Sequence, residues 1–148
     1  MSKSIFHAAQ RAEIQQRLAR LAPERAPRWG KMNAPKMVMH LADALKMALG
    51  ELPVKPRKTP LRFPVIKHLA IYVLPWPKGT PTAPELLARV PAAWTGEVVA
   101  LSALVEKFSS RSAGDQWPPH PAFGKMSGRL WGALVYRHCD HHFTQFGI

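Results

Sequence analysis

Histidines are concentrated near the end of the chain, at positions 138, 141 and 142. In a helix, residues four apart lie about 40° apart around the axis and one turn along it, so His138 and His142 can direct their rings at one ion. Their stripe continues through Trp131, Val135 and Phe146, which predicts that both rings face inward. Helical zinc enzymes use imidazole pairs with this spacing, although such pairs also occur on solvated helix faces. The pair therefore indicates a divalent-metal site.

A third ligand is expected from His40. It lies in line with Met37, Ala44 and Met47, on the apolar side of a segment that begins after Asn33. Three neutral imidazoles leave at least one coordination position for water or substrate, which is the arrangement of a catalytic site rather than a closed structural one. A single histidine on an apolar face is more often a core residue satisfied by a hydrogen bond, so His40 indicates a metal only together with the pair.

Two neighbouring groups could modify this ligand set. His141 lies about 60° from His138 on the other side of the helix and could replace His142 if the helix were rotated. Asp43 follows His40 by about one turn, from where it could orient that imidazole. Beyond His141 and Asp43 the sequence offers no strong general base, so no catalytic residue is assigned.

The remaining reactive side chains are expected to play no chemical role. Cys139 lies about 100° from His138, so we expect neither a nucleophile nor a metal ligand there. Asp140 projects away from the ring pair and is interpreted as a solvated or capping charge. The other histidines fall in the first helix or in proline-rich segments: His7, His68 and His120.

Four amphipathic segments are expected to position these side chains, because apolar residues recur in each at three-to-four spacing. They are residues 4–21, 34–49, about 18 residues after Pro91 that end near Ser110 or Arg111, and 128–146. Asn33 and Ser127 are predicted N-caps, and Gly50 and Gly147 are predicted stops. Four such helices without a convincing strand pair favour an all-α four-helix bundle, with residues 1–148 as a single domain.

The connection between the second and third helices is long and rich in proline. Seven prolines lie between Glu51 and Pro84, which exclude a long regular element. The apolar piece at residues 65–74 is expected to cover one end of the bundle as a short helix or a strand, between which periodicity does not decide.

The chain is strongly basic, with 21 Lys and Arg against 9 Asp and Glu and a formal charge of +12. Such a charge attracts phosphates, acidic proteins or anionic membrane surfaces. An alternative function is therefore a nucleic-acid or polyanion-binding module that uses Trp76 beside the basic crossover. It is less favoured, since the charges are scattered and no recognition motif is present. A third possibility is a non-catalytic bundle that mediates protein association.

The sequence also bears on compartment. The longest apolar stretch is far shorter than the roughly 20 residues that span a bilayer, so no membrane partner is expected. The first ten residues lack the apolar run of a secretory signal. The single cysteine suits a reducing compartment. We therefore expect a cytoplasmic protein.

Two segments are distinctive: WGKMNAPKMVMHLAD at residues 29–43 and HCDHHFTQFG at residues 138–147. Both resemble the DinB-like (DinB/YfiT) superfamily of proposed metalloenzymes. The likeness is greatest to a bacterial branch without an assigned activity, in which HPAFG at residues 120–124 is also typical. The resemblance covers nearly the whole chain, and the proline-rich crossover is its least specific part.

This resemblance implies an up-down-down-up bundle, often dimeric, that binds nickel, zinc or another divalent ion through one histidine of the second helix and an H-x-x-x-H pair of the last. Here those positions are His40, His138 and His142, and the doubled His141-His142 departs from the simplest pattern. Some relatives are thiol-dependent transferases or metal-dependent hydrolases and isomerases. The expected function is accordingly a metal-dependent hydrolase or transferase acting on a small molecule.

Overall fold

The computed structural model describes residues 2–148, and its regular secondary structure is helical. The elements in chain order are α1 (Ala8–Arg20), α2 (Ala34–Ala48), η1 (Pro60–Arg62), α3 (Pro64–His68), η2 (Leu69–Val73), η3 (Pro84–Leu87), α4 (Trp94–Ser109) and α5 (Gly128–Gln145). η1 and η3 are short 3-10 helices, and η2 is a short π-helix. Within residues 2–148, β-type pairing is limited to an isolated bridge between His120 and Gly124. The all-α fold expected from the sequence is confirmed.

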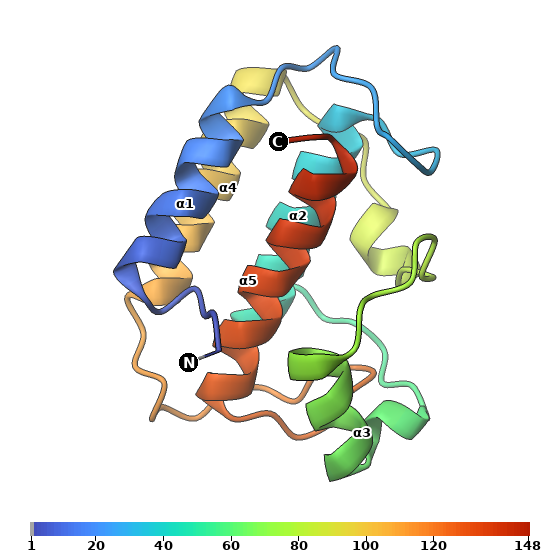
Figure 1. The fold of residues 1–148 in the computed structure, drawn as a ribbon, viewed down its shortest axis with the longest axis vertical. Helices are drawn as coiled ribbons and strands as arrows, with labels where there is room; N and C mark the ends of the chain where they lie inside the picture. The colour runs from blue at the N-terminus through green and yellow to red at the C-terminus, as the bar shows by residue number, and fades with distance from the viewer. Residues whose placement is uncertain (1) are drawn as a thin grey trace.

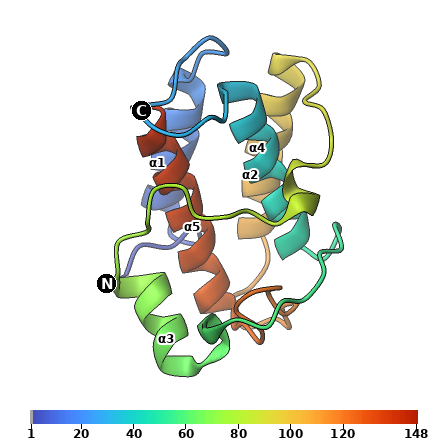
Figure 2. The same cartoon turned by 90° about the vertical axis from the view of Figure 1, so that its right-hand side faces the viewer.

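The four long helices form a bundle in which α1 and α5 run in one direction and α2 and α4 in the other (Figures 1 and 2). α2 packs against α4, α1 packs against α5, and the α1–α4 and α2–α5 contacts close the ring. Since α2 and α4 are parallel neighbours, the chain between them must return along the whole bundle, which is why this connection is long. The order is therefore up-down-down-up.

The predicted helix boundaries of α2 and α5 are confirmed by their caps. The Asn33 side-chain oxygen accepts a hydrogen bond from the Lys36 amide at 2.9 Å, and the Ser127 hydroxyl accepts one from the Leu130 amide at 3.3 Å. Gly147 follows α5 with a φ of +73°, a conformation that a side chain disfavours. These ends fix the register of the two helices that carry the histidines.

The first helix starts later than predicted, at Ala8 rather than at residue 4. The reason is a tertiary contact. Ile5 is fully buried, and its amide donates to the Gly132 carbonyl of α5 at 3.0 Å. Gly132 permits this approach, because a Cβ there would lie 2.4 Å from the Phe6 ring. This packed turn at residues 4–7 replaces a first helical turn.

The proline-rich crossover contains the piece that the sequence left undecided between helix and strand, and it is helical. α3 and η2 form one short continuous helical rod at the end of the bundle where α5 begins (Figure 1). The buried Lys67 amine donates to the Lys125 carbonyl at 2.6 Å, and Arg137 of α5 donates to the Ala70 carbonyl at 2.9 Å. These bonds hold the rod against the bundle.

η3, later in the crossover, is held beside α2 by an ion-pair group around the partly buried Arg89. Arg89 pairs with Asp43 of α2 at 3.0 Å and with Glu97 of α4, whose second oxygen accepts from the guanidinium at 3.0 Å. Both carboxylates are buried. This arrangement fixes the backbone of η3 next to His40.

Among the residues described, the helices include none whose length and apolar character would let it cross a bilayer.

Candidate metal centre

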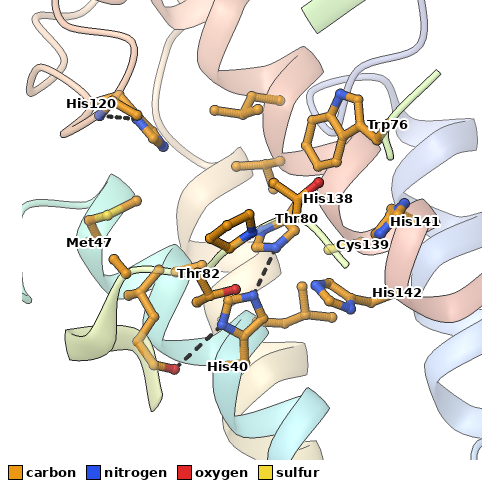
Figure 3. Close-up of a pocket in the computed structure, with 18 of the residues that line it drawn as sticks. His40, Met47, Trp76, Thr80, Thr82, His120, His138, Cys139, His141 and His142 are labelled. Atoms are coloured by element: carbon orange, nitrogen blue, oxygen red, sulfur yellow. Dashed lines mark hydrogen bonds between the residues drawn. The ribbon is translucent and has the colours of Figure 1, made fainter. Parts of the chain in front are cut away.

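His40 of α2 meets His138 and His142 of α5 inside the bundle (Figure 3). One ring nitrogen from each lies within 4.8 Å of the others, and the Nε2 atoms of His40 and His138 are 2.9 Å apart. His40 and His142 are buried, and His138 is partly buried. The three residues predicted from spacing are therefore brought together. We call them the histidine trio.

The separations suit a single ion. Nitrogens bound to one zinc ion at about 2.1 Å lie roughly 3 to 4 Å apart, depending on the angle between them. The 2.9 Å contact is at the short end of that range, and 4.8 Å exceeds it by less than about 1 Å, which a small ring rotation removes. Three imidazole nitrogens suit zinc, nickel, copper or iron. The trio could hold a divalent metal ion.

Two hydrogen bonds outside the trio set which nitrogens face the centre. Nδ1 of His142 contacts the Gln145 Oε1 atom at 2.8 Å, and the Gln145 amide group donates to the Trp29 carbonyl at 2.9 Å. A carbonyl only accepts, so Gln145 must present its oxygen to His142, and Nδ1 of His142 carries the proton. This leaves the Nε2 lone pair of His142 free to bind a cation.

His40 is oriented in the same way, by the backbone of η3. Its Nδ1 lies 3.4 Å from the Leu86 carbonyl, which makes Nδ1 the protonated nitrogen and Nε2 the free one. The role anticipated for Asp43 is therefore wrong: its carboxylate is engaged by Arg89 and, at 3.6 Å, by Lys46. Gln145 was missed, although its place one turn after His142 was a usable signal. The Leu86 carbonyl leaves no signal in the sequence.

Burial keeps the trio neutral. It lowers the pKa of His40 to about 4 and that of His142 to about 3, and it takes the pKa of His138 well below its usual value. At neutral pH the three imidazoles are therefore uncharged, so a cation does not meet a positively charged ring. This is the protonation state that metal binding requires.

No family model, curated protein or solved structure matches this chain. The chemistry of the site is accordingly argued from its own geometry.

The trio borders a cavity of about 620 Å³. Its wall is mainly apolar, and Trp76 packs its ring 6.0 Å from that of His138. Thr80 and Thr82 add hydroxyl groups beside the trio (Figure 3). Exposed cations also line it, and of the residues in the described part of the chain none that lines it is acidic. The site can therefore admit a small molecule with an apolar body.

The neighbouring groups of α5 do not join the trio. His141 is partly buried and packs between Trp29 and Trp76, with ring centroids 5.9 and 5.7 Å away. Cys139 is buried, and the loss of hydration raises the pKa of its thiol to about 12, which agrees with the expected lack of reactivity. Asp140, interpreted as a solvated or capping charge, instead pairs with Arg17 of α1 at 2.6 Å.

The three remaining histidines are not part of the trio, although His120 borders the same cavity. His120 is in the loop before α5, as expected, where its Nδ1 accepts from the amides of Ala122 and Phe123 at 3.0 and 3.2 Å. His68 is exposed on α3. His7, predicted within the first helix, precedes it as the N-cap residue.

Proposed function

We propose that this protein is a metal-dependent enzyme in which the histidine trio binds one zinc or nickel ion. The proposed reaction is hydrolysis or thiol-dependent transfer on a small molecule held in the adjoining cavity. The observation that carries this proposal is the convergence of three neutral, oriented imidazoles beside an apolar cavity. The resemblance to DinB-like proteins supports it, since the same three positions and the same helix order are expected there.

A purely structural histidine cluster explains the arrangement less well. His40 and His142 each donate the Nδ1 proton to an acceptor outside the trio, so the Nε2 atom of each presents a lone pair to its centre. The Nε2 of His138 can donate to one of them only. Within the trio, Nε2 of His138 contacts Nε2 of His40, which leaves the Nε2 lone pair of His142 without a donor from the trio, and a bound cation would engage all three rings.

The chemistry follows from this environment. When bound, the ion would lower the pKa of a coordinated water or thiol towards neutrality and polarise the substrate. The protein's own residues orient the ligands through Leu86 and Gln145 and exclude water with Trp76 and the apolar wall. His141 also borders the cavity, with its ring centroid 5.3 Å from that of His142, and it could exchange a proton with substrate.

The nucleic-acid alternative required the Trp76 ring to be available for stacking on a base. The indole N–H of Trp76 donates to the Ala70 carbonyl at 2.8 Å, and the ring packs against His138 and His141 rather than facing an open surface. A homodimer and a cytoplasmic location remain predictions.

The test is to purify the untagged protein, dialyse it against zinc or nickel, and measure bound metal by mass spectrometry. We expect about one ion per chain, lost in His40→Ala, His138→Ala and His142→Ala. His141→Ala is the matched control, because it removes an imidazole from the same helix and should keep the ion. An equal metal content in all five proteins, or none in the wild type, would eliminate the proposal.

A further inference from the structure

The rod formed by α3 and η2 carries apolar side chains on the side that faces away from the protein. We call this set the outer face: Phe63, Val65, Ile66, Leu69, Val73 and Leu74. Phe63 is 65% exposed and Val65 is 71% exposed. Isolated exposed apolar residues are ordinary, but four in one short rod, with Phe63 and Leu74 at its two ends, form a patch of the kind that marks an interaction surface.

The outward direction follows from helical geometry. At about 100° per residue, positions 65, 66, 69 and 73 fall within an arc of roughly 100°. The opposite side is already packed, since Ile71 is buried and the Lys67 amine donates to the Lys125 carbonyl. Most of the apolar side chains of the rod therefore face solvent, and fewer of them pack against the bundle.

Positive charge surrounds this face. Residues 52–84 contain six Lys and Arg and no Asp or Glu. Lys58 and Arg62, which lead into the rod, are exposed, and so are Lys125 and Arg129 beside the adjoining start of α5. An occupant of the outer face must therefore accept apolar side chains and carry negative charge.

We propose that the outer face docks the protein on an anionic phospholipid bilayer. A second copy of this chain is a poor occupant, because pairing two outer faces would bring two sets of these cations together. α3 also stands out from the end of the bundle (Figures 1 and 2), so it presents a ridge to its surroundings. An apolar ridge flanked by Lys and Arg is suited to insertion at the boundary between acyl chains and phosphate headgroups.

Docking in this way would place the cavity at the membrane. The same crossover contributes Leu61, Ala70 and Trp76 to the cavity wall. The proposal departs from the expectation of no membrane partner, which rested on spanning helices alone. It does not depend on the metal, and His138→Ala should bind lipid as the wild type does.

The test is flotation of the full chain with vesicles of phosphatidylglycerol and phosphatidylcholine, compared with phosphatidylcholine alone. We expect binding to the anionic vesicles only, weakened by added salt. The double variant Val65→Ser, Val73→Ser should bind at least about tenfold more weakly, because it removes apolar surface from the bilayer. The matched control is Val90→Ser, Val99→Ser, which changes two exposed valines outside the outer face and should bind like the wild type.

Two charge-reversal variants test the electrostatic part of the proposal. Lys58→Glu should weaken vesicle binding about tenfold. Lys36→Glu, the same change at the exposed start of α2 in the other half of the bundle, should have a much smaller effect. Absence of vesicle binding would overturn the proposal, as would binding that the valine variant leaves unchanged. A dimer in sedimentation that the valine variant dissociates, without vesicle binding, would assign the face to a second copy instead.

Discussion

Replacing Gln145 with leucine tests whether the ligands are oriented as the structure indicates. Gln145 is buried and bridges two groups, with Oε1 2.8 Å from Nδ1 of His142 and Nε2 2.9 Å from the Trp29 carbonyl. Leucine has a similar volume but forms neither bond. Removal of the partner that orients a ligating histidine typically weakens metal binding about 10- to 100-fold. Two lost hydrogen bonds and two unsatisfied groups should also reduce the free energy of unfolding by about 2–3 kcal/mol.

Gln145→Glu separates orientation from stability. A carboxylate still accepts from Nδ1 of His142, but it has no proton for the Trp29 carbonyl. We therefore expect Gln145→Glu to lose stability while it binds zinc at least as tightly as the wild type. The measurements are zinc competition against a fluorescent chelator and urea unfolding of the metal-free proteins.

Two results would refute this reasoning. If Gln145→Leu binds zinc as tightly as the wild type despite its lower stability, the side chain only supports the fold. If Gln145→Glu loses as much zinc affinity as Gln145→Leu, acceptance of the Nδ1 proton does not orient His142. Either result would leave the metal proposal to stand on the His→Ala series alone.

Two further predictions concern stability. Arg89→Met should lower the free energy of unfolding, measured in urea, by about 3 kcal/mol, because it leaves the buried carboxylates of Asp43 and Glu97 without their shared cation. As a control, the exposed Arg20→Met should lower it by less than about 0.5 kcal/mol. Equal losses in the two variants would contradict the ion-pair account. His120 should make stability pH-dependent, because burial lowers its folded pKa to about 4 from an unfolded value near 6.5. The unfolded chain then takes up the proton first, so stability is retained above pH 6.5 and falls as pH drops towards 4, by up to about 3 kcal/mol. A His120→Ala variant with the same pH slope in urea unfolding as the wild type would contradict this.

The long helices and the trio could be predicted because both depend on local periodicity. Asn33 and Ser127 cap their helices through bonds within one turn, so the sequence alone identifies them. The i,i+4 spacing then directs His138 and His142 to one side, and the apolar stripe makes that side the inner one. Only the pairing with His40 requires tertiary structure, and the shared inward direction of the two helices supplies it.

The roles of Asp43 and of the first residues could not be predicted for a different reason. Asp43 is one turn from His40, which made it the natural group to orient that imidazole. Its carboxylate instead pairs with Arg89, 46 residues further along the chain. Similarly, nothing local indicates that the Ile5 amide would donate to Gly132. In both cases a contact distant in sequence outweighed a plausible local one.

The crossover is where local reasoning is weakest, and it is also where the site gains its specific surroundings. Its prolines prevent the long periodic pattern from which burial is normally inferred, so neither the Leu86 carbonyl beside His40 nor the outward direction of Val65 and Val73 could be predicted. Apolar residues at helical spacing normally face the core. Here only one side of the rod packs against the bundle, and Ile71 and Lys67 already occupy that side. The surplus apolar side chains must therefore either cost solubility or contact something outside the chain, and the charge around them favours an anionic surface.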